Sequence, residues 1–464
     1  MGSELFHSAK AALSVQTLIK PSWKKLAIFS FTPLFLATTS LTANAQEAVA
    51  AAPAADTAYI FNTLLFLIGG FLVMWMAAGF AMLEAGLVRS KNVSMQCLKN
   101  IALYSIAGLM YWLIGYNLMY TGVDGGYMGS FSFIYAMDPV GLDGADSAAL
   151  LETGYSTASD WFFQMVFVAT AASIVSGTLA ERIKLWPFLL FVVFLTGFIY
   201  PIAGSWQWGG GWLSEMGFSD FAGSTLVHSV GGWAALTGAI LLGARKGKYT
   251  ANGVSPMPGS SIPLATLGTF ILWLGWFGFN GASQLAMGTI SDISDVSRIF
   301  VNTNMAAASG VVVTMILLQF MYKKVDVTMT LNGALAGLVA ITAEPLAPTV
   351  AQAIFIGGIG GVIVVFTVPL LDKFKIDDVV GAIPVHLLAG IWGTFIVPLS
   401  NSGTSYGVQL IGIVSYAAFT IICSLIVWGI IKAVIGIRVS EEEELLGLDK
   451  AEIGVEAYPE FTSR

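Results

Sequence analysis

Two of the chain's three histidines lie inside long apolar runs, and their flanking residues match. Asp220 precedes His228 by eight residues, and Asp378 precedes His386 by eight; a valine directly precedes each histidine and a glycine follows four residues later. An ionisable side chain at membrane depth is costly, so it indicates a functional site by default. Imidazole can donate, accept or relay a proton near neutral pH. Two such groups in matched settings suggest one site built from two related halves.

The composition predicts a membrane protein. Hydrophobic residues make up 56% of the chain, charged residues only 11%, and the mean hydropathy is +0.78. Globular domains carry about 25% charged residues, so this chain has little charge with which to face water. The net charge of -7 is not the basic footprint of a nucleic-acid partner. Cys97 and Cys423 are interpreted as small buried hydrophobes rather than as a disulfide or metal ligands.

The N-terminal segment 1–45 has the pattern of a secretory signal peptide. Three lysines precede an apolar run at 26–36, and Ala43-Asn44-Ala45 is a small-x-small cleavage site. The alternative is an uncleaved first transmembrane helix, but the run is short and Pro33 interrupts it. An extracytoplasmic linker, 46–58, is expected to follow.

Eleven later stretches are long and apolar enough to cross about 30 Å of hydrocarbon as helices. They are 59–83, 100–120, 160–180, 186–205, 225–243, 262–282, 299–321, 330–347, 350–371, 382–398 and 409–436. The sequence thus predicts an all-α membrane domain at 59–438 and a short tail at 439–464.

The loop charges give this domain an orientation. With the mature N-terminus outside, sixteen of the 21 Lys and Arg residues fall in segments predicted to be cytoplasmic; Arg298 alone lies opposite, and the leader holds the rest. This is the bias of the positive-inside rule, and it places the tail in the cytoplasm. Asp220 then lies outside and Asp378 inside. Two inverted five-helix repeats, with an eleventh helix added at the C-terminal end, would produce that arrangement.

The spans hold almost no ionisable groups besides the two histidines. Glu84 and Glu181, near the cytoplasmic ends, are interpreted as local ion pairs with the adjacent Arg89 and Arg182. No carboxylate ring could replace the hydration shell of a cation, and an unpaired ion would not shed its water in an apolar lumen. A small solute that can become neutral could pass.

Aromatic residues suggest a cation site at the outer end. The loop before Asp220 holds three tryptophans, and the third and sixth helices hold pairs of phenylalanines. These residues are Trp206, Trp208, Trp212, Phe163, Phe167, Phe277 and Phe279. Aromatic faces bind ammonium-type cations. The alternative for each ring is an interfacial belt or core packing.

Several strings, in order along the chain, resemble the ammonium transporter (Amt) family. They are Glu84–Val93, Ala180–Ile183, Asp220–Arg245, Gly275–Asn280 and Phe300–Asn304. The likeness covers essentially the whole mature chain. It implies an eleven-span homotrimer in a bacterial inner membrane, with a pore for ammonium or ammonia through each subunit, methylammonium as an analogue and no cofactor.

The resemblance also implies roles for individual residues. His228 and His386 match twin pore histidines that share a hydrogen bond. Asp220 matches a buried acidic residue that supports the outer site structurally and electrostatically.

At the outer end, Phe167 and Phe279 match a phenylalanine gate. Trp208 and Ser283, together with Phe167, match the ammonium recruitment site. The expected mechanism is recruitment of NH₄⁺, deprotonation and conduction of NH₃, with or without a separate proton.

Two positions depart from the family pattern. Many members have an aspartate where this chain has Gly381, which bears on the cytoplasmic exit. Where many have a histidine before the tail glycine, this chain has Ile453. The tail resembles a regulatory segment that meets PII-type signalling proteins.

Three rival functions stay open at this stage. The first is a Rh-like channel for NH₃ or CO₂, against which Trp208 argues, because a gas pore has little need of a cation site. The second is an ammonium sensor that reports through its tail. The third is a membrane enzyme with the histidines as metal ligands, although two histidines without a nearby carboxylate or cysteine make a poor metal set.

Overall fold

The computed structural model describes residues 55–138 and 144–460. The predicted signal peptide (1–45), the first nine residues of the predicted linker and the last four of the tail lie outside the described residues.

Eleven helical segments occupy the predicted positions, several of them as consecutive helical pieces. The first six are α1 (Ala55–Leu87), η2–α2–η3–α3 (Ser90–Tyr120), α5 (Thr157–Thr178), α6–η4–α7 (Leu185–Ser205), η5–α9 (Ser224–Leu242) and α10–η6 (Ile262–Gln284). The other five are α11 (Ile290–Tyr322), α12 (Val327–Ile341), α13 (Val350–Lys373), η7–α14–η8 (Ile383–Leu399) and α15 (Tyr406–Val434). Within the described ranges, nine are long and apolar enough to cross a membrane, and α12 and Ile383–Leu399 are the two shorter apolar segments.

The connections contain smaller elements that the sequence did not predict. They are α4 (Gly144–Thr153), α8 (Trp212–Glu215), the hairpin of β1 (Tyr249–Thr250) and β2 (Gly253–Val254), α16 (Glu441–Leu446) and the π-helical turn η9 (Asp449–Ile453).

Helix ends are where the prediction and the structure differ most. The second segment begins at Ser90 rather than 100, and α11 begins at Ile290 rather than 299. Both extensions carry polar residues that a hydropathy criterion rejects. In the second segment, Gln96 and Lys99 are fully buried, and Gln96 Nε2 and Lys99 Nζ donate hydrogen bonds to other helices. Segment hydropathy cannot detect such partners.

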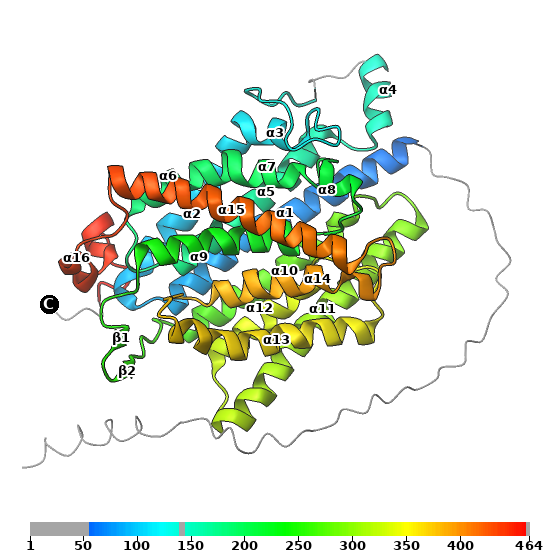
Figure 1. Cartoon of the computed structure of the whole chain (residues 1–464). Helices are drawn as coiled ribbons and strands as arrows, with labels where there is room; N and C mark the ends of the chain where they lie inside the picture. The colour runs from blue at the N-terminus through cyan, green and yellow to red at the C-terminus, as the bar shows by residue number, and fades with distance from the viewer. Residues whose placement is uncertain (1–54, 139–143, 461–464) are drawn as a thin grey trace, which may run out of the picture.

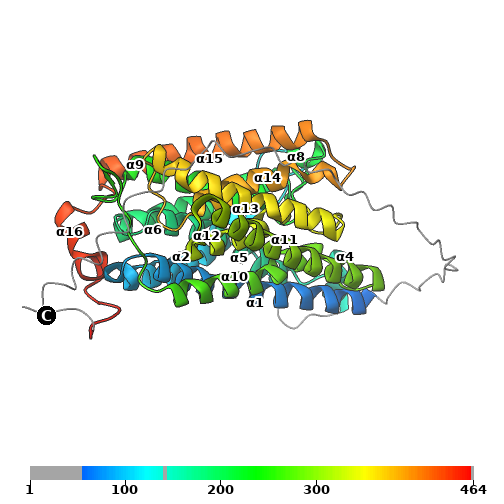
Figure 2. The same cartoon turned by 90° about the horizontal axis from the view of Figure 1, so that it is seen from below.

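The long helices run between two ends of the molecule (Figures 1 and 2), here called the Trp208 end and the tail end. α4 and α8 lie at the Trp208 end, and α16 and the β1–β2 hairpin lie at the tail end. Loops predicted to share a side do meet. At the Trp208 end, Phe221 N donates to Ala343 O (2.8 Å). At the tail end, Arg182 Nη2 donates to Asp377 O (2.6 Å).

The two histidine-bearing segments cross in the middle of the fold, and the matched glycines allow the crossing. A Cβ on Gly232 would lie 2.6 Å from Leu387 Cβ, and a Cβ on Gly390 would lie 2.3 Å from Ser224 O. Each glycine therefore contacts the segment of the other half. Small residues at such positions let helix backbones approach closely. The repeat read from the sequence is thus a feature of the packing.

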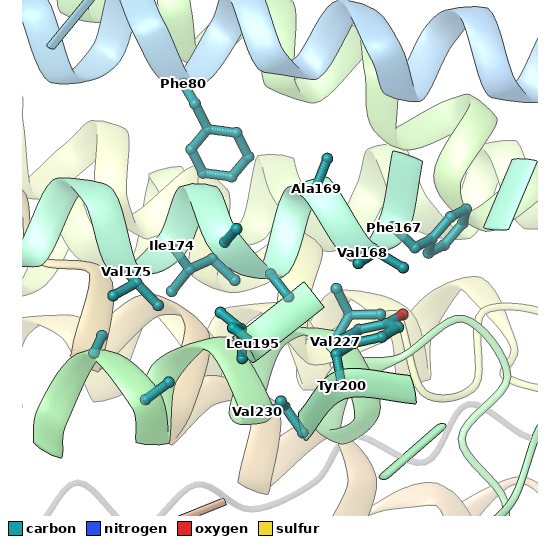
Figure 3. Close-up of a cluster of buried hydrophobic side chains, with 14 of the residues drawn as sticks. Phe80, Phe167, Val168, Ala169, Ile174, Val175, Leu195, Tyr200, Val227 and Val230 are labelled. Carbon is teal, nitrogen blue, oxygen red and sulfur yellow. The ribbon is translucent and has the colours of Figure 1, made fainter. Parts of the chain in front are cut away.

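Around this crossing, α1, α5 and α9 enclose the hydrophobic core (Figure 3). Phe80 of α1 points toward α5, while Val227 and Val230 lie on the other side of α5 from Phe80. All three side chains are buried. α5 is the most enclosed of the nine candidate spans, since 89% of its apolar window is buried. It therefore has protein on nearly every side, which makes it a suitable element to carry site residues.

The tail packs back onto the helix ends. The Asp449 carboxylate accepts hydrogen bonds from the backbone N–H groups of Ser94 (3.1 Å) and Met95 (2.9 Å), at the first turn of α2. A carboxylate is favourable at a helix N-terminus, where backbone N–H groups lack partners. Burial is the main reason that the pKa of Asp449 is raised. Ile453, one of the two departures, is partly buried against the core.

Candidate functional site

The matched aspartates cap the segments that carry the histidines. Asp220 is fully buried, and its carboxylate accepts four backbone N–H groups, those of residues 223 to 226, at 2.8–3.1 Å. Asp378 accepts the N–H groups of Gly381 (3.2 Å) and Ile383 (2.7 Å) in the same way. The spacing of eight residues is therefore the distance from a capping carboxylate to a histidine about one turn inside the helix.

A left-handed residue makes each cap possible. Gly223 has φ +103° and Gly381 has φ +79°, in the region that glycine enters without steric cost. A Cβ on Gly381 would also lie 2.4 Å from Asn332 Nδ2. In this fold a side chain at position 381 would therefore be strained and crowded, and glycine avoids both.

The crossing brings the two histidines into contact. The Nδ1 atoms of His228 and His386 are 3.2 Å apart, and the ring centroids are 5.2 Å apart with planes 20° from parallel. Both side chains are buried. A hydrogen bond between two Nδ1 atoms requires one to carry the proton and the other to accept. The Nε2 atoms then differ, since the ring that donates through Nδ1 presents an acceptor and the other presents a donor. The pair can offer both kinds of hydrogen bond to a small solute.

Two aromatic side chains from α10 fix His228. Trp276 stacks on its ring at 5.0 Å and 16°, and Phe279 at 5.2 Å and 27°. Trp276 Nε1 donates to Thr342 Oγ1 at 2.8 Å, which anchors the indole. Sequence reasoning did not assign a role to Trp276. The available signal was its spacing of three residues from Phe279, which places both on one face of a helix.

The predicted outer residues also come together. The rings of Phe167 and Phe279 are 4.1 Å apart and tilted by 37°, and Trp208 meets Phe167 edge to face at 5.8 Å. Phe167 and Phe279 are both buried. Because Phe279 also stacks on His228, the two phenylalanines separate the histidine pair from Trp208. The two residues predicted to form a gate are thus in contact with each other.

Ser283 and Asp220 support this cluster from either side. Ser283 is partly buried, and its hydroxyl donates to Phe279 O at 2.7 Å, one turn away on the same helix. Trp208 Nε1 donates to the backbone oxygen of Asp220 at 2.8 Å. The Asp220 carboxylate is occupied with backbone N–H groups and does not face Trp208, which fits a structural role. Phe277, in contrast, packs against Phe300 (5.1 Å) and not against the gate.

Glu181 does form ion pairs, but neither glutamate pairs with the arginine adjacent to it in the sequence, so both predicted pairings are wrong. Arg89 does pair with Glu181 (2.5 Å), which Arg245 also contacts (3.2 Å). Glu84 pairs with neither arginine; its carboxylate accepts from Gln96 and Ser176. The prediction assumed that each glutamate pairs with an arginine close to it in the sequence, whereas the partners of Glu84 come from α2 and α5.

Asp377 is the other end of the arginine network. Arg245 donates to both carboxylate oxygens of Asp377, from Nε at 2.8 Å and Nη2 at 2.9 Å. Burial alone would raise the pKa of Asp377, but these hydrogen bonds and the charges of Arg182 and Arg245 hold the pKa well below its ordinary value. The network ties together the four loops that follow α1, α5, α9 and α13.

A cavity opens on the tail-end side of the histidines. His386 and Phe80 stand at one end of its lining and Glu84 and Val380 at the other. The full lining comprises Phe80, Leu83, Glu84, Ser173, Ile174, Gly177, Asn332, Leu335, Val380, Ala382, Val385 and His386. Buried aromatics thus cover the histidine pair on the Trp208 side, and an enclosed space approaches it from the other.

Fold and site together define a multi-pass α-helical membrane protein with a buried polar pair at the crossing of two related halves. The chain belongs to the Ammonium Transporter Family, whose model matches residues 64–458.

Relatives agree over nearly the full length. The chain is 41% identical to ammonium transporter Amt2 of Archaeoglobus fulgidus, over 92% of this chain and 94% of that one. Among solved structures, a protein titled Sensor Amt Protein matches with a TM-score of 0.77 and 36% identity, covering 84% of this chain and 98% of that one. Candida albicans Mep2 matches with a TM-score of 0.74 and 26% identity, covering 87% and 91%.

Proposed function

We propose that this protein is an ammonium transporter that recruits NH₄⁺ at Trp208, Phe167 and Ser283. The support is the aromatic cluster, since Trp208 is partly exposed and stands edge to face on the gate ring of Phe167. Aromatic faces attract ammonium-type cations, an effect worth about 0.5–2 kcal/mol depending on desolvation. The hydroxyl oxygen of Ser283 keeps an accepting lone pair while it donates to Phe279 O.

Beyond the gate the conducted species is NH₃. An ion that entered the apolar space behind Phe167 and Phe279 would lose its hydration with no charged partner to replace it, which costs far more than a pair of imidazoles returns. Ammonia needs only one donor and one acceptor, which are the free Nε2 functions of His228 and His386. The observation that carries the proposal is the 3.2 Å contact between their Nδ1 atoms, directly behind the gate.

The same proposal sets the protein's place in the cell. The Trp208 end faces outward and the tail end inward, because the tail end collects the lysines and arginines. Residues 1–45 act as a signal peptide, 46–58 as an external linker, 59–438 as the transporter domain and 439–464 as a cytoplasmic regulatory tail. The protein is a homotrimer in the lipid of a bacterial inner membrane. The docked tail offers a surface to a PII-type protein.

The test is uptake of labelled methylammonium, with ammonium as competitor, into proteoliposomes that carry purified protein. His228→Ala and His386→Ala are expected to change flux or selectivity against K⁺, and Trp208→Leu to weaken competition by ammonium. Phe277→Leu is the control, because Phe277 packs against Phe300 away from the gate. Unchanged flux and selectivity in both histidine variants would remove the pair from the mechanism.

Two alternatives make different predictions in the same assay. A Rh-like NH₃ or CO₂ channel would show no competition between ammonium and methylammonium at micromolar concentrations. An ammonium sensor, suggested by the structural relative titled Sensor Amt Protein, would bind ammonium with little flux and change its tail contacts. Trp208 on the gate favours a cation-recruiting transporter over the first.

A further inference from the structure

Glu84 is a buried carboxylate that the proposed transport path does not use. It lies in α1, one helical turn beyond Phe80, whose ring is 6.1 Å from that of His386. Residues four apart on a helix share a face, and both line the cavity on the tail-end side of the histidines. The Glu84 side chain is 0% exposed. Glu84 and His386 therefore border the same cavity.

One oxygen of this carboxylate is held in place and the other has no partner. Oε2 accepts from Gln96 Nε2 (2.7 Å) and from Ser176 Oγ (2.8 Å). Oε1 is buried with no hydrogen-bond donor among the described residues. Leaving a buried charged acceptor unsatisfied costs more than the roughly 1–3 kcal/mol of a neutral group. A ligand that donates hydrogen bonds would remove that cost.

The polar groups behind Glu84 add further acceptors, although Gln96 and Asn100 are not part of the cavity lining. Gln96 Oε1 and Asn100 Oδ1 are likewise buried without a donor among the described residues. Gln96 bonds directly to Glu84, and Asn100 follows one turn later and donates to the Gln96 backbone oxygen. Ser173, in the cavity wall, already directs its hydroxyl hydrogen to Ala169 O, so toward the cavity it can only accept.

The positive charge of Lys99 stabilises the buried Glu84 carboxylate, while its ammonium group donates its hydrogen bond elsewhere. Its Nζ donates to the backbone oxygen of Ser176 (2.9 Å) and sits 4.8 Å from the centre of the Phe188 ring. Lys99 is fully buried, so its charge is weakly screened and favours an ionised Glu84 through space. Oε1 itself has no hydrogen-bond donor among the described residues.

We propose that the cavity between His386 and Glu84 is an inner binding site for ammonium, with the Glu84 carboxylate as its counter-ion. The inference rests on the proposed function and adds a second cation site to it, on the far side of the histidine pair from Trp208. Ammonium has four N–H donors and no acceptor, which matches the Glu84 Oε1 atom that lacks a donor and the accepting hydroxyl oxygen of Ser173. Ammonia that becomes protonated on this side is held there before release.

Glu84→Gln is the decisive variant, because it keeps the shape and removes the charge. Glu344→Gln is the matched control: Glu344 is also a buried glutamate, but both of its oxygens have donors, from Ala347 N and Asn401 Nδ2. The probe is Tl⁺, a monovalent cation close to ammonium in size, located by anomalous diffraction from crystals of the full chain. The second readout is inhibition of methylammonium uptake by ammonium loaded inside proteoliposomes. Cleavage of the tail shows in which direction the protein is inserted in the vesicle membrane.

The parent and Glu344→Gln are expected to show an anomalous peak within contact of Glu84 Oε1, displaced by excess ammonium, and Glu84→Gln to show none. Internal ammonium should inhibit the Glu84→Gln variant with a half-maximal concentration roughly tenfold or more above the parent, the equivalent of one lost charge-assisted hydrogen bond. No peak in the parent, or an equal peak in Glu84→Gln, would overturn the inference. Ammonium uptake by the parent tests the proposed function separately, so it can succeed where the inner site fails.

Discussion

Removing the charge of Asp220 should destabilise the fold by an amount that its hydrogen bonds allow us to work out. Four backbone N–H groups converge on this carboxylate, and none can reach water because the residue is fully buried. In Asp220→Asn one oxygen can keep two of the four, while the amide NH₂ faces the other two. Two buried donors without acceptors cost about 1–3 kcal/mol each, so we expect about 4 kcal/mol.

Asp220→Ala would leave all four donors unsatisfied and cost about twice as much, which approaches the roughly 5–15 kcal/mol that holds a typical domain together. The Asn variant is therefore the informative one. The assay is thermal unfolding of detergent-purified protein, followed by tryptophan fluorescence, together with hydrogen exchange of the backbone at residues 223–226. A midpoint roughly 4 °C lower and faster exchange confined to these amides are expected.

Asp292→Asn is the matched control, because Asp292 caps α11 from a partly exposed position in a capping box with Thr289. Its loss should cost about 1 kcal/mol or less. If Asp220→Asn unfolds at the parent's temperature and its amides at 223–226 exchange at the parent's rate, the carboxylate is not what holds this turn, and the argument from buried donors is wrong.

Two further predictions concern packing and pH. Gly390→Ala places a methyl group 2.3 Å from Ser224 O at the crossing of the halves, whereas a methyl on Gly429 meets nothing within 4 Å. Gly390→Ala should lower the free energy of unfolding by about 1–3 kcal/mol and with it the unfolding midpoint, and Gly429→Ala should leave the midpoint unchanged. Equal midpoints would show that the crossing is looser than described. The pKa of Asp377 is lowered in the folded state, so its pairing with Arg245 stabilises the protein fully above the ordinary aspartate pKa of 3.8, and that stability is lost as pH falls below it. In unfolding midpoints measured from pH 7 to pH 3, Asp377→Asn should therefore be less stable than the parent at pH 7 and approach it at pH 3, and a constant difference would refute this.

Much of the fold could be predicted from the sequence because the signals are local. Length and hydropathy predicted eleven helices, since each segment is by itself long and apolar enough to leave water for the membrane. The matched spacing of Asp220–His228 and Asp378–His386 predicted related halves, and the structure gives that spacing a local cause: a capping carboxylate, a left-handed glycine and a helix that starts at a fixed distance. The helix starts at Ser90 and Ile290 were missed for different reasons. Near Ser90, buried polar residues bond to partners on other helices. The first turns of α11 are mostly exposed and begin at a local capping box, which a hydropathy criterion does not detect.

The pairings between helices were decided by the tertiary structure. Apolar segments pack on one another through shape and a few buried hydrogen bonds, and neither property is visible in the composition of either segment. This is why the sequence paired Glu84 with the nearby Arg89, while the fold gave Glu84 to Gln96 and Ser176 and brought Arg89 to Glu181. Trp276 likewise gained a role only when α10 was placed beside His228. The residue types of the candidate site can be read from the sequence, but the contacts that give them their chemistry exist only after the helices have packed.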